Sequence, residues 1–107
     1  MIGNYKIITL CGSTQFKKQF LEMQKRLTLE GNIVLSVGLF GHSGDNESCD
    51  ETTKKMLDDM HKRKIDLSDE VYIINPGGYI GSSTQSEIDY ARSVKKKIRC
   101  YSTDGID

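Results

Sequence analysis

Four short apolar runs alternate along the chain with three helical patterns, and this alternation limits the possible folds more than any other feature of the sequence. The runs cover residues 6–11, 33–37, 71–74 and 97–101. Each run is short, and the runs are rich in β-branched and other apolar residues, which is typical of buried strands. Parallel strands need a long crossover between them, so the order βαβαβαβ predicts an α/β three-layer sandwich with right-handed crossovers. We therefore expect a flavodoxin-like or Rossmann-like parallel sheet of four or five strands.

The helical patterns have clear starts and stops. The first begins near Ser13 or Thr14 and ends at about Glu30, just before a glycine of the usual left-handed helix stop. The second is opened by acidic residues at positions 50 and 51 and reaches about Asp66. Its expected inner positions are Met56, Met60 or His61, and Ile65.

Length and composition exclude several classes of protein. The 107 residues are enough for one domain, residues 1–107, and the 15 basic and 15 acidic residues cancel, so we expect no nucleic-acid polymer or membrane surface as partner. Three cysteines without framework spacing predict reduced thiols in a cytoplasmic protein, with Cys11 and Cys100 as small core residues. His42 matches no known metal-ligand spacing with Cys49 or Asp45, so no metal and no cofactor is expected.

Three polar turns follow predicted strands and should meet at one edge of the sheet. They cover residues 12–14, 38–50 and 77–84. Ligands of open parallel sheets bind outside the carboxyl ends of the strands, near the point where the strand order reverses. The last turn, rich in glycine and serine, offers N–H groups, hydroxyls and a helix N-terminus to an anion or a polyol. The middle turn is long enough to fold over such a site.

Glu87 has two interpretations. With Thr84 it fits a capping box, in which the glutamate bonds back to the N–H of the capping residue. Alternatively it faces the cleft as a nucleophile or acid/base group, with a pKa that burial would raise and a helix N-terminus would lower. His61 is likewise open to two interpretations, as a packing residue or as a proton-transfer group.

Four ordered segments together resemble a known enzyme superfamily. They read LCGS at 10–13, IVLSVGLFGH at 33–42, HKRKIDLSDEV at 61–71 and INPGGYIGSSTQSEIDYA at 74–91. The set resembles the nucleoside 2-deoxyribosyltransferase superfamily, which also includes 2'-deoxynucleoside 5'-monophosphate N-glycosidases. The resemblance extends over residues 6–101.

The resemblance implies an enzyme that cleaves or exchanges the bond between a nucleobase and a 2-deoxyribose. Glu87 falls on the family's nucleophile, and His61 stands where the family has an aspartate and could protonate the leaving base. Thr9 replaces a tyrosine of the first motif. The expected substrate-binding residues are Gly12, Ser13, Phe40, Gly78, Gly81, Ser82 and Ser83, with Phe40 stacking on the base.

Two further expectations concern the oligomeric state and an alternative function. Family sites are often completed across an interface, so we expect a homodimer or higher homo-oligomer that acts on a nucleoside or nucleotide. The alternative function is a non-catalytic nucleotide-binding or sensing module that uses the same cleft.

Overall fold

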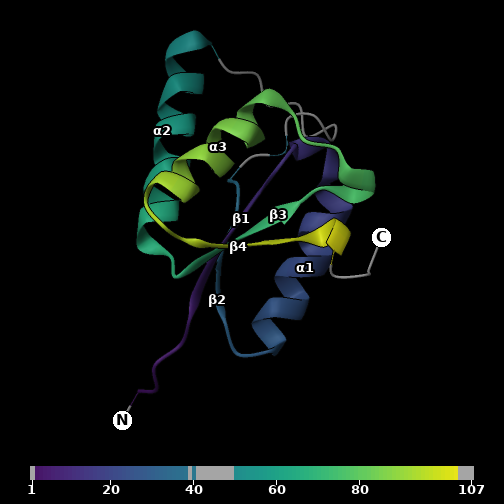
Figure 1. The fold of residues 1–107 in the computed structure, drawn as a ribbon, viewed down its shortest axis with the longest axis vertical. Coiled ribbons are helices and arrows are strands. Elements are labelled where there is room, and N and C mark those ends of the chain that lie inside the picture. Colours follow the sequence, from purple (N-terminus) through teal and green to yellow (C-terminus); the bar gives the residue numbers. More distant parts are fainter. Residues whose placement is uncertain (1, 39, 41–49, 104–107) are drawn as a thin grey trace.

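The computed structural model describes residues 2–38, 40 and 50–103 and has the predicted α/β architecture (Figure 1). Four parallel strands, in the order β2-β1-β3-β4, form its sheet. The strands are β1 (Ile7–Gly12), β2 (Ile33–Leu35), β3 (Glu70–Ile74) and β4 (Lys97–Cys100). The helices that connect them are α1 (Lys17–Leu29), α2 (Glu51–Leu67) and α3 (Ser82–Ser93). The predicted fold class is therefore confirmed, with four strands in the described part of the chain.

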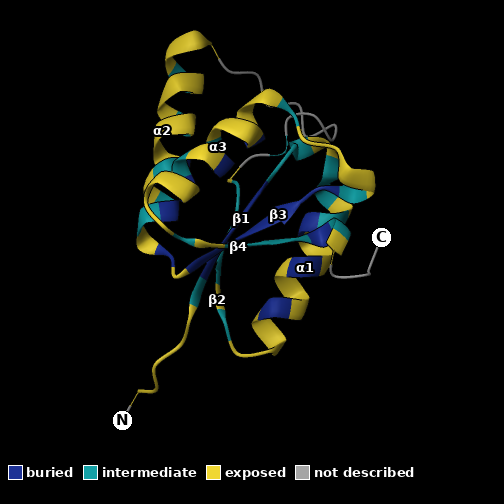
Figure 2. Cartoon of the chain, in the orientation of Figure 1, coloured by how far each residue is buried: buried dark blue, intermediate teal, exposed yellow. Residues whose placement is uncertain are grey.

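The alternation of side chains along β1 and β3 divides the core into two layers. On one face, Ile8 and Leu10 of β1 pack with Tyr72 of β3 against α1. On the other face, Cys11 and Val71 pack against α2 and α3. Figure 2 shows the result, with buried residues on the strands and on the inner faces of the helices. One helix thus covers one face and two helices cover the other.

The order in which strands are added to the sheet reverses between β1 and β3. From β1 it moves outward through α1 to β2, and α2 then carries it back past β1 to form β3 on the other side. The register pairs Gly12 with Ile74, so the carboxyl ends of both central strands stop together. Open parallel sheets bind ligands at such a reversal point.

The helix α2 begins where it was predicted, but not all of its predicted inner residues are buried. Asp50 is its N-cap, and the carboxylate accepts a hydrogen bond of 2.7 Å from the Thr53 N–H. Of the alternatives Met60 and His61, His61 is the buried one, while Met60 is 44% exposed; the prediction was wrong for Met56, which is 51% exposed. The buried positions are His61 and Ile65, with Leu57 half-buried one turn earlier, so the inner stripe follows a spacing of four residues and leaves the two methionines beside it.

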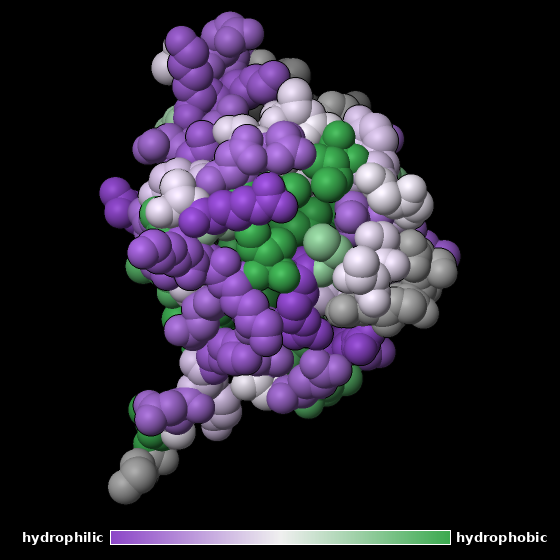
Figure 3. All heavy atoms as spheres, viewed as in Figure 1, coloured by the Kyte–Doolittle hydropathy of each residue, from purple (hydrophilic) through white to green (hydrophobic). Residues whose placement is uncertain are grey.

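The surface is mainly polar. The face shown in Figure 3 is largely hydrophilic, with an apolar area over the edge strand β4. Of the helices that the structure describes, none is both long and apolar enough to cross a membrane.

The strand predicted over residues 33–37 is shorter than expected and ends at Leu35.

Gly12 is a tight packing position, which yields a stability prediction. A Cβ at residue 12 would lie 2.6 Å from the Ile74 carbonyl oxygen and 3.0 Å from the Ile74 Cβ. Gly12→Ala should therefore lower the free energy of unfolding by about 1–3 kcal/mol, because β1 and β3 must move apart. Chemical denaturation measures this change. Gly38→Ala is the matched control, since a Cβ there meets no described residue within 4 Å. Equal losses in the two variants would contradict the packing argument.

Candidate active site

A cavity of about 790 Å³ opens at the carboxyl edge of the sheet and brings the predicted turns together. Its wall includes residues 12–15 at and after the end of β1, residues 37–38 after β2 and residues 79, 81–84 and 87 before and within α3. The remaining wall comes from α2, through Lys54, Leu57, Asp58, Met60, His61 and Lys64. The predicted meeting of these turns is confirmed for the described residues; residues 39 and 41–49 of the middle turn lie outside them.

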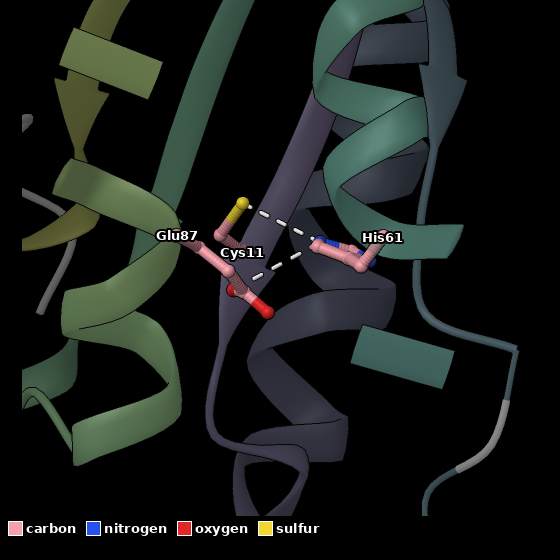
Figure 4. Close-up of side chains that lie close together, drawn as sticks. All are labelled: Cys11, His61 and Glu87. Atoms are coloured by element: carbon pink, nitrogen blue, oxygen red, sulfur yellow. Dashed lines mark hydrogen bonds and ion pairs between the residues drawn. The ribbon is translucent and has the colours of Figure 1, made fainter. Parts of the chain in front are cut away.

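The start of α3 excludes one of the two interpretations of Glu87, the capping box. Gly81 is the N-cap, in extended conformation, and Ser82 is the first helical residue. Thr84 is therefore the third residue of the helix and is buried, so it is not the cap. The predicted capping box is wrong, because Glu87 lies in the second turn, beyond reach of the N-cap N–H. Its side chain instead points toward β1 and α2 (Figure 4).

Three side chains from three elements converge beneath the cavity. Cys11 is supplied by β1, His61 by α2 and Glu87 by α3 (Figure 4). The Cys11 Sγ lies 3.4 Å from the His61 Nε2, and the same nitrogen lies 4.0 Å from a Glu87 carboxylate oxygen. Glu87 and His61 line the cavity, and Cys11 is wholly buried behind them. The cluster therefore has a buried side and a side open to a ligand.

Burial sets the protonation states of this cluster. Loss of solvent raises the pKa of Glu87 from 4.5 to about 7, against the opposing effect of a hydrogen bond with Cys11. Burial also lowers the pKa of His61 from 6.5 to about 4, with the charge of Lys64 adding to this shift. The pKa of Cys11 is raised well above its usual value, first by burial and then by the charge of Glu87. At neutral pH the site thus holds a neutral imidazole, a thiol and a carboxyl group that ionises readily.

The helix N-terminus does not hold down the pKa of Glu87, although that was one of the two expected effects. The favourable field of a helix end is confined to its first turn, and Glu87 is the sixth residue of α3. Desolvation dominates instead, because the side chain is only 14% exposed. The carboxylate is consequently basic enough to pick up a proton near neutral pH.

Most of the predicted substrate-binding residues line the cavity, and two do not. Those on its wall are Gly12, Ser13, Gly81, Ser82 and Ser83. Phe40 packs instead on Phe20, with ring centroids 5.5 Å apart, and joins the core layer beneath α1. Gly78 is not among the described wall residues; its φ of 83° serves the short 3-10 turn after β3. Among the described residues, the structure thus gives neither Phe40 nor Gly78 the expected place on the cavity wall.

Sequence reasoning missed several residues of the site. Cys11 was expected only as a core residue, and Tyr79 was assigned no role although it lines the cavity and packs edge-on against Phe16 at 5.8 Å. Asp58 also lines the cavity and a smaller hollow of about 220 Å³ beside Glu87. One signal was available for Asp58: it precedes His61 by three positions, so a helix places both on one side. No comparable signal in the sequence links Cys11 to Glu87.

The opposed pKa shifts predict a distinctive pH dependence of stability. A raised pKa means that Glu87 favours the folded state below pH 4.5, and this contribution is lost as pH rises through about 7. Glu87→Gln removes this loss, so its free energy of unfolding relative to that of the unchanged protein should rise by up to about 3 kcal/mol between pH 4.5 and 8. Denaturation curves across this range measure the difference, and a difference independent of pH would contradict the burial argument.

His61 should produce the opposite trend in the same experiment. Its lowered pKa means that the neutral imidazole contributes stability above pH 6.5, which is lost as pH falls through about 4. In the unchanged protein the two trends offset each other between pH 4.5 and 6.5. In Glu87→Gln only the loss on the acid side remains, so that variant should weaken more steeply on acidification.

Comparison with known proteins adds no further guide to the site. A scan against protein-family models finds no match, and a search of curated proteins finds no relative. The cavity, the buried cluster and the sequence motifs are therefore the features that bear on function.

Proposed function

We propose that this protein cleaves or exchanges the N-glycosidic bond of 2'-deoxynucleosides or their 5'-monophosphates, with Glu87 as nucleophile. One observation carries the proposal: the Glu87 carboxyl group stands on the wall of a cavity large enough for a nucleoside, at the strand-order reversal. The volume of about 790 Å³ lies within the usual range of small-molecule sites. The motif resemblance independently points to the same glutamate.

The environment of Glu87 suits attack on an anomeric carbon. The transition state of glycosidic cleavage carries positive charge on the sugar, and a carboxylate in a poorly solvated site stabilises that charge strongly. A bond forms between a Glu87 oxygen and C1', the bond from C1' to the base nitrogen breaks, and its electron pair leaves with the base. Ser82 and Ser83, at the N-terminus of α3, are placed on the cavity wall to bind sugar hydroxyls or a 5'-phosphate.

His61 is better suited to the second step than to the first. Its pKa of about 4 keeps the imidazole neutral, so it is a poor proton donor for a leaving base. The neutral imidazole can accept a hydrogen bond from the water, or from the second base, that attacks C1' and releases Glu87, but its low pKa makes it a weak base. In hydrolysis the proton of the attacking water ends on the released base, which left C1' with its electron pair and is more basic than this imidazole. The expected role of His61 as acid in the first step is therefore replaced here by a role in orienting the attacking group.

The proposed partner of the protein is its small-molecule substrate. The substrate is a small nucleoside or nucleotide, and no nucleic-acid polymer is required. A homodimer in the cytoplasm stays a prediction of the sequence and of the family resemblance.

Replacement of the nucleophile gives the direct test. Glu87→Gln keeps the shape of the side chain and should lower kcat/KM at least about a thousandfold, because the covalent step is lost. Release of free base from deoxynucleosides and deoxynucleoside 5'-monophosphates, with and without a second base, measures this activity. Asp89→Asn is the matched control, since Asp89 is an exposed carboxylate on the same helix. Base exchange would identify a transferase, and deoxyribose 5-phosphate a hydrolase.

Absence of turnover would favour the alternative function. If the unchanged protein binds nucleotides and releases no base, and Glu87→Gln binds equally well, the cleft belongs to a non-catalytic binding or sensing module. Turnover that survives in Glu87→Gln would refute the role of this residue while leaving the reaction class intact.

The pKa of Glu87 also predicts the pH–rate profile. Only the ionised carboxylate attacks C1', so kcat/KM should fall about tenfold per pH unit below pH 7 and level off above it. Initial rates at low substrate concentration between pH 5 and 9 provide the measurement. A rate that stays constant down to pH 5 would show that the essential carboxylate has an ordinary pKa.

A further inference from the structure

The cluster beneath the cavity contains three different kinds of metal ligand. Cys11, His61 and Glu87 offer a sulfur, a nitrogen and a carboxylate oxygen, and these atoms all lie within 4.8 Å of one another (Figure 4). We propose that they form a binding site for a single Zn²⁺ ion, with a fourth coordination position open to the cavity. This inference goes beyond the proposed function, because metal binding does not depend on glycosidic chemistry.

Two of the three separations between the ligand atoms are close to those of a tetrahedral zinc site, and the third is no longer than 4.8 Å. Zinc binds sulfur at about 2.3 Å and nitrogen or oxygen at about 2.0–2.2 Å, which puts a sulfur and a nitrogen about 3.6 Å apart. The observed distance from the Cys11 Sγ to the His61 Nε2 is 3.4 Å. The distance from that nitrogen to the Glu87 oxygen is 4.0 Å, so the carboxylate needs to move inward by about half an ångström. A change in the Glu87 side-chain torsions supplies such a movement.

The charges also balance. A zinc ion displaces the proton of the Cys11 thiol and leaves Glu87 ionised, so two negative ligands and one neutral imidazole surround a charge of +2. Cys11 is 0% exposed and His61 is 6% exposed, so an uncompensated charge there would be costly. The total charge of the ion and its three ligands is zero. A bound Zn²⁺ would therefore stabilise the Cys11 thiolate and the Glu87 carboxylate, which are unfavourable in this buried place without it.

The surroundings of the three ligands match the two sides of a reactive zinc site. On the closed side, Cys11 is wholly buried in the core layer that also contains Ile65 and Ile88. On the open side, His61 and Glu87 line the cavity, through which the ion can enter. Three protein ligands with an open fourth position are the usual arrangement where zinc remains exchangeable or reactive.

The ligand types select among metals. A thiolate and an imidazole favour zinc and other late divalent transition metals, whereas Mg²⁺ and Ca²⁺ require a shell of oxygen atoms. Occupation by zinc would engage the carboxylate that the proposed reaction uses as its nucleophile. The bound metal should therefore inhibit base release, and a chelator should restore it.

The test uses the full chain with Cys11 as its sole thiol. Cys49→Ser and Cys100→Ser together give this parent protein, in which any metal–thiolate signal arises from Cys11. Co²⁺ serves as spectroscopic probe, since it replaces zinc and produces a near-ultraviolet thiolate charge-transfer band and visible bands of tetrahedral cobalt. Competition with a chromophoric chelator then gives the affinity for Zn²⁺.

Three ligand variants of the parent protein are compared with a matched control. Cys11→Ser should abolish the charge-transfer band, and each of Cys11→Ser, His61→Gln and Glu87→Gln should weaken Zn²⁺ binding by about 100-fold or more, since even indirect contacts of metal ligands are worth about 10–100-fold. His42→Gln is the control, because it removes the other histidine of the chain, and it should leave the affinity unchanged.

Several results would overturn the zinc site. These are the absence of a charge-transfer band in the parent protein, a band that survives in Cys11→Ser, and a loss of affinity in His42→Gln equal to that in His61→Gln. If Cys11→Ser does not fold, the other two ligand variants still decide the matter, because zinc should raise the melting temperature of the parent protein and not theirs. An equal rise in parent and variants would place the metal elsewhere on the chain.

The outcomes separate this inference from the proposed reaction. Cobalt spectra and zinc affinity require no turnover, so a zinc site stands even if no base is ever released. Conversely, base release that depends on Glu87 but is unaffected by zinc, with no cobalt band, would retain the proposed reaction and refute the metal site.

Discussion

The close pairing of β1 with β3 at their carboxyl ends is the constraint on which the site depends. Gly12 faces Ile74 across the sheet, and the absence of a Cβ lets the two strands approach fully. Both strands then end at the same level, so the turn that follows each one opens into the same space. Since the strand order reverses between β1 and β3, helices α2 and α3 lie on one face beside this edge. A displacement here would separate Cys11 from the two helices that complete the cluster.

The cluster of Cys11, His61 and Glu87 lowers the stability of the fold. Its neighbours in the same core layer are apolar, including Ile65, Ile88 and Ala91. A buried carboxyl group and imidazole in such a layer cost stability that apolar side chains of similar volume would not, because each loses its hydration. Consistency between local pattern and core packing is the rule in folded proteins, and it is broken mainly where a function requires it. The geometry thus makes this place in the core the strongest candidate for a functional site.

The sequence predicted the fold well because periodicity and strand length report directly on burial. The strand boundaries fall within two residues of those expected, and Asp50 caps α2 as its position suggested. The errors arise where a residue's role depends on packing between elements. Phe40 packs edge-on against Phe20 of α1. Glu87 misses the capping geometry because α3 starts earlier, at Ser82. The partnership of Cys11 with Glu87 spans the sheet and a helix, so no local pattern could reveal it.

The two proposals for Glu87 rest on one electrostatic property. Burial makes its carboxylate unfavourable unless positive charge comes close, and the nearby cations supply little: Lys62 opposes the pKa shift only as a minor effect, and Lys64 donates its ammonium proton to the Ser36 carbonyl at 2.7 Å. A positively charged ligand or ion bound in the cavity would therefore stabilise the ionised carboxylate most. A sugar that develops positive charge at C1' and a zinc ion both meet this need, at the same oxygen atom. They must compete, since a zinc ion bound to the carboxylate withdraws the electron density that would attack C1'.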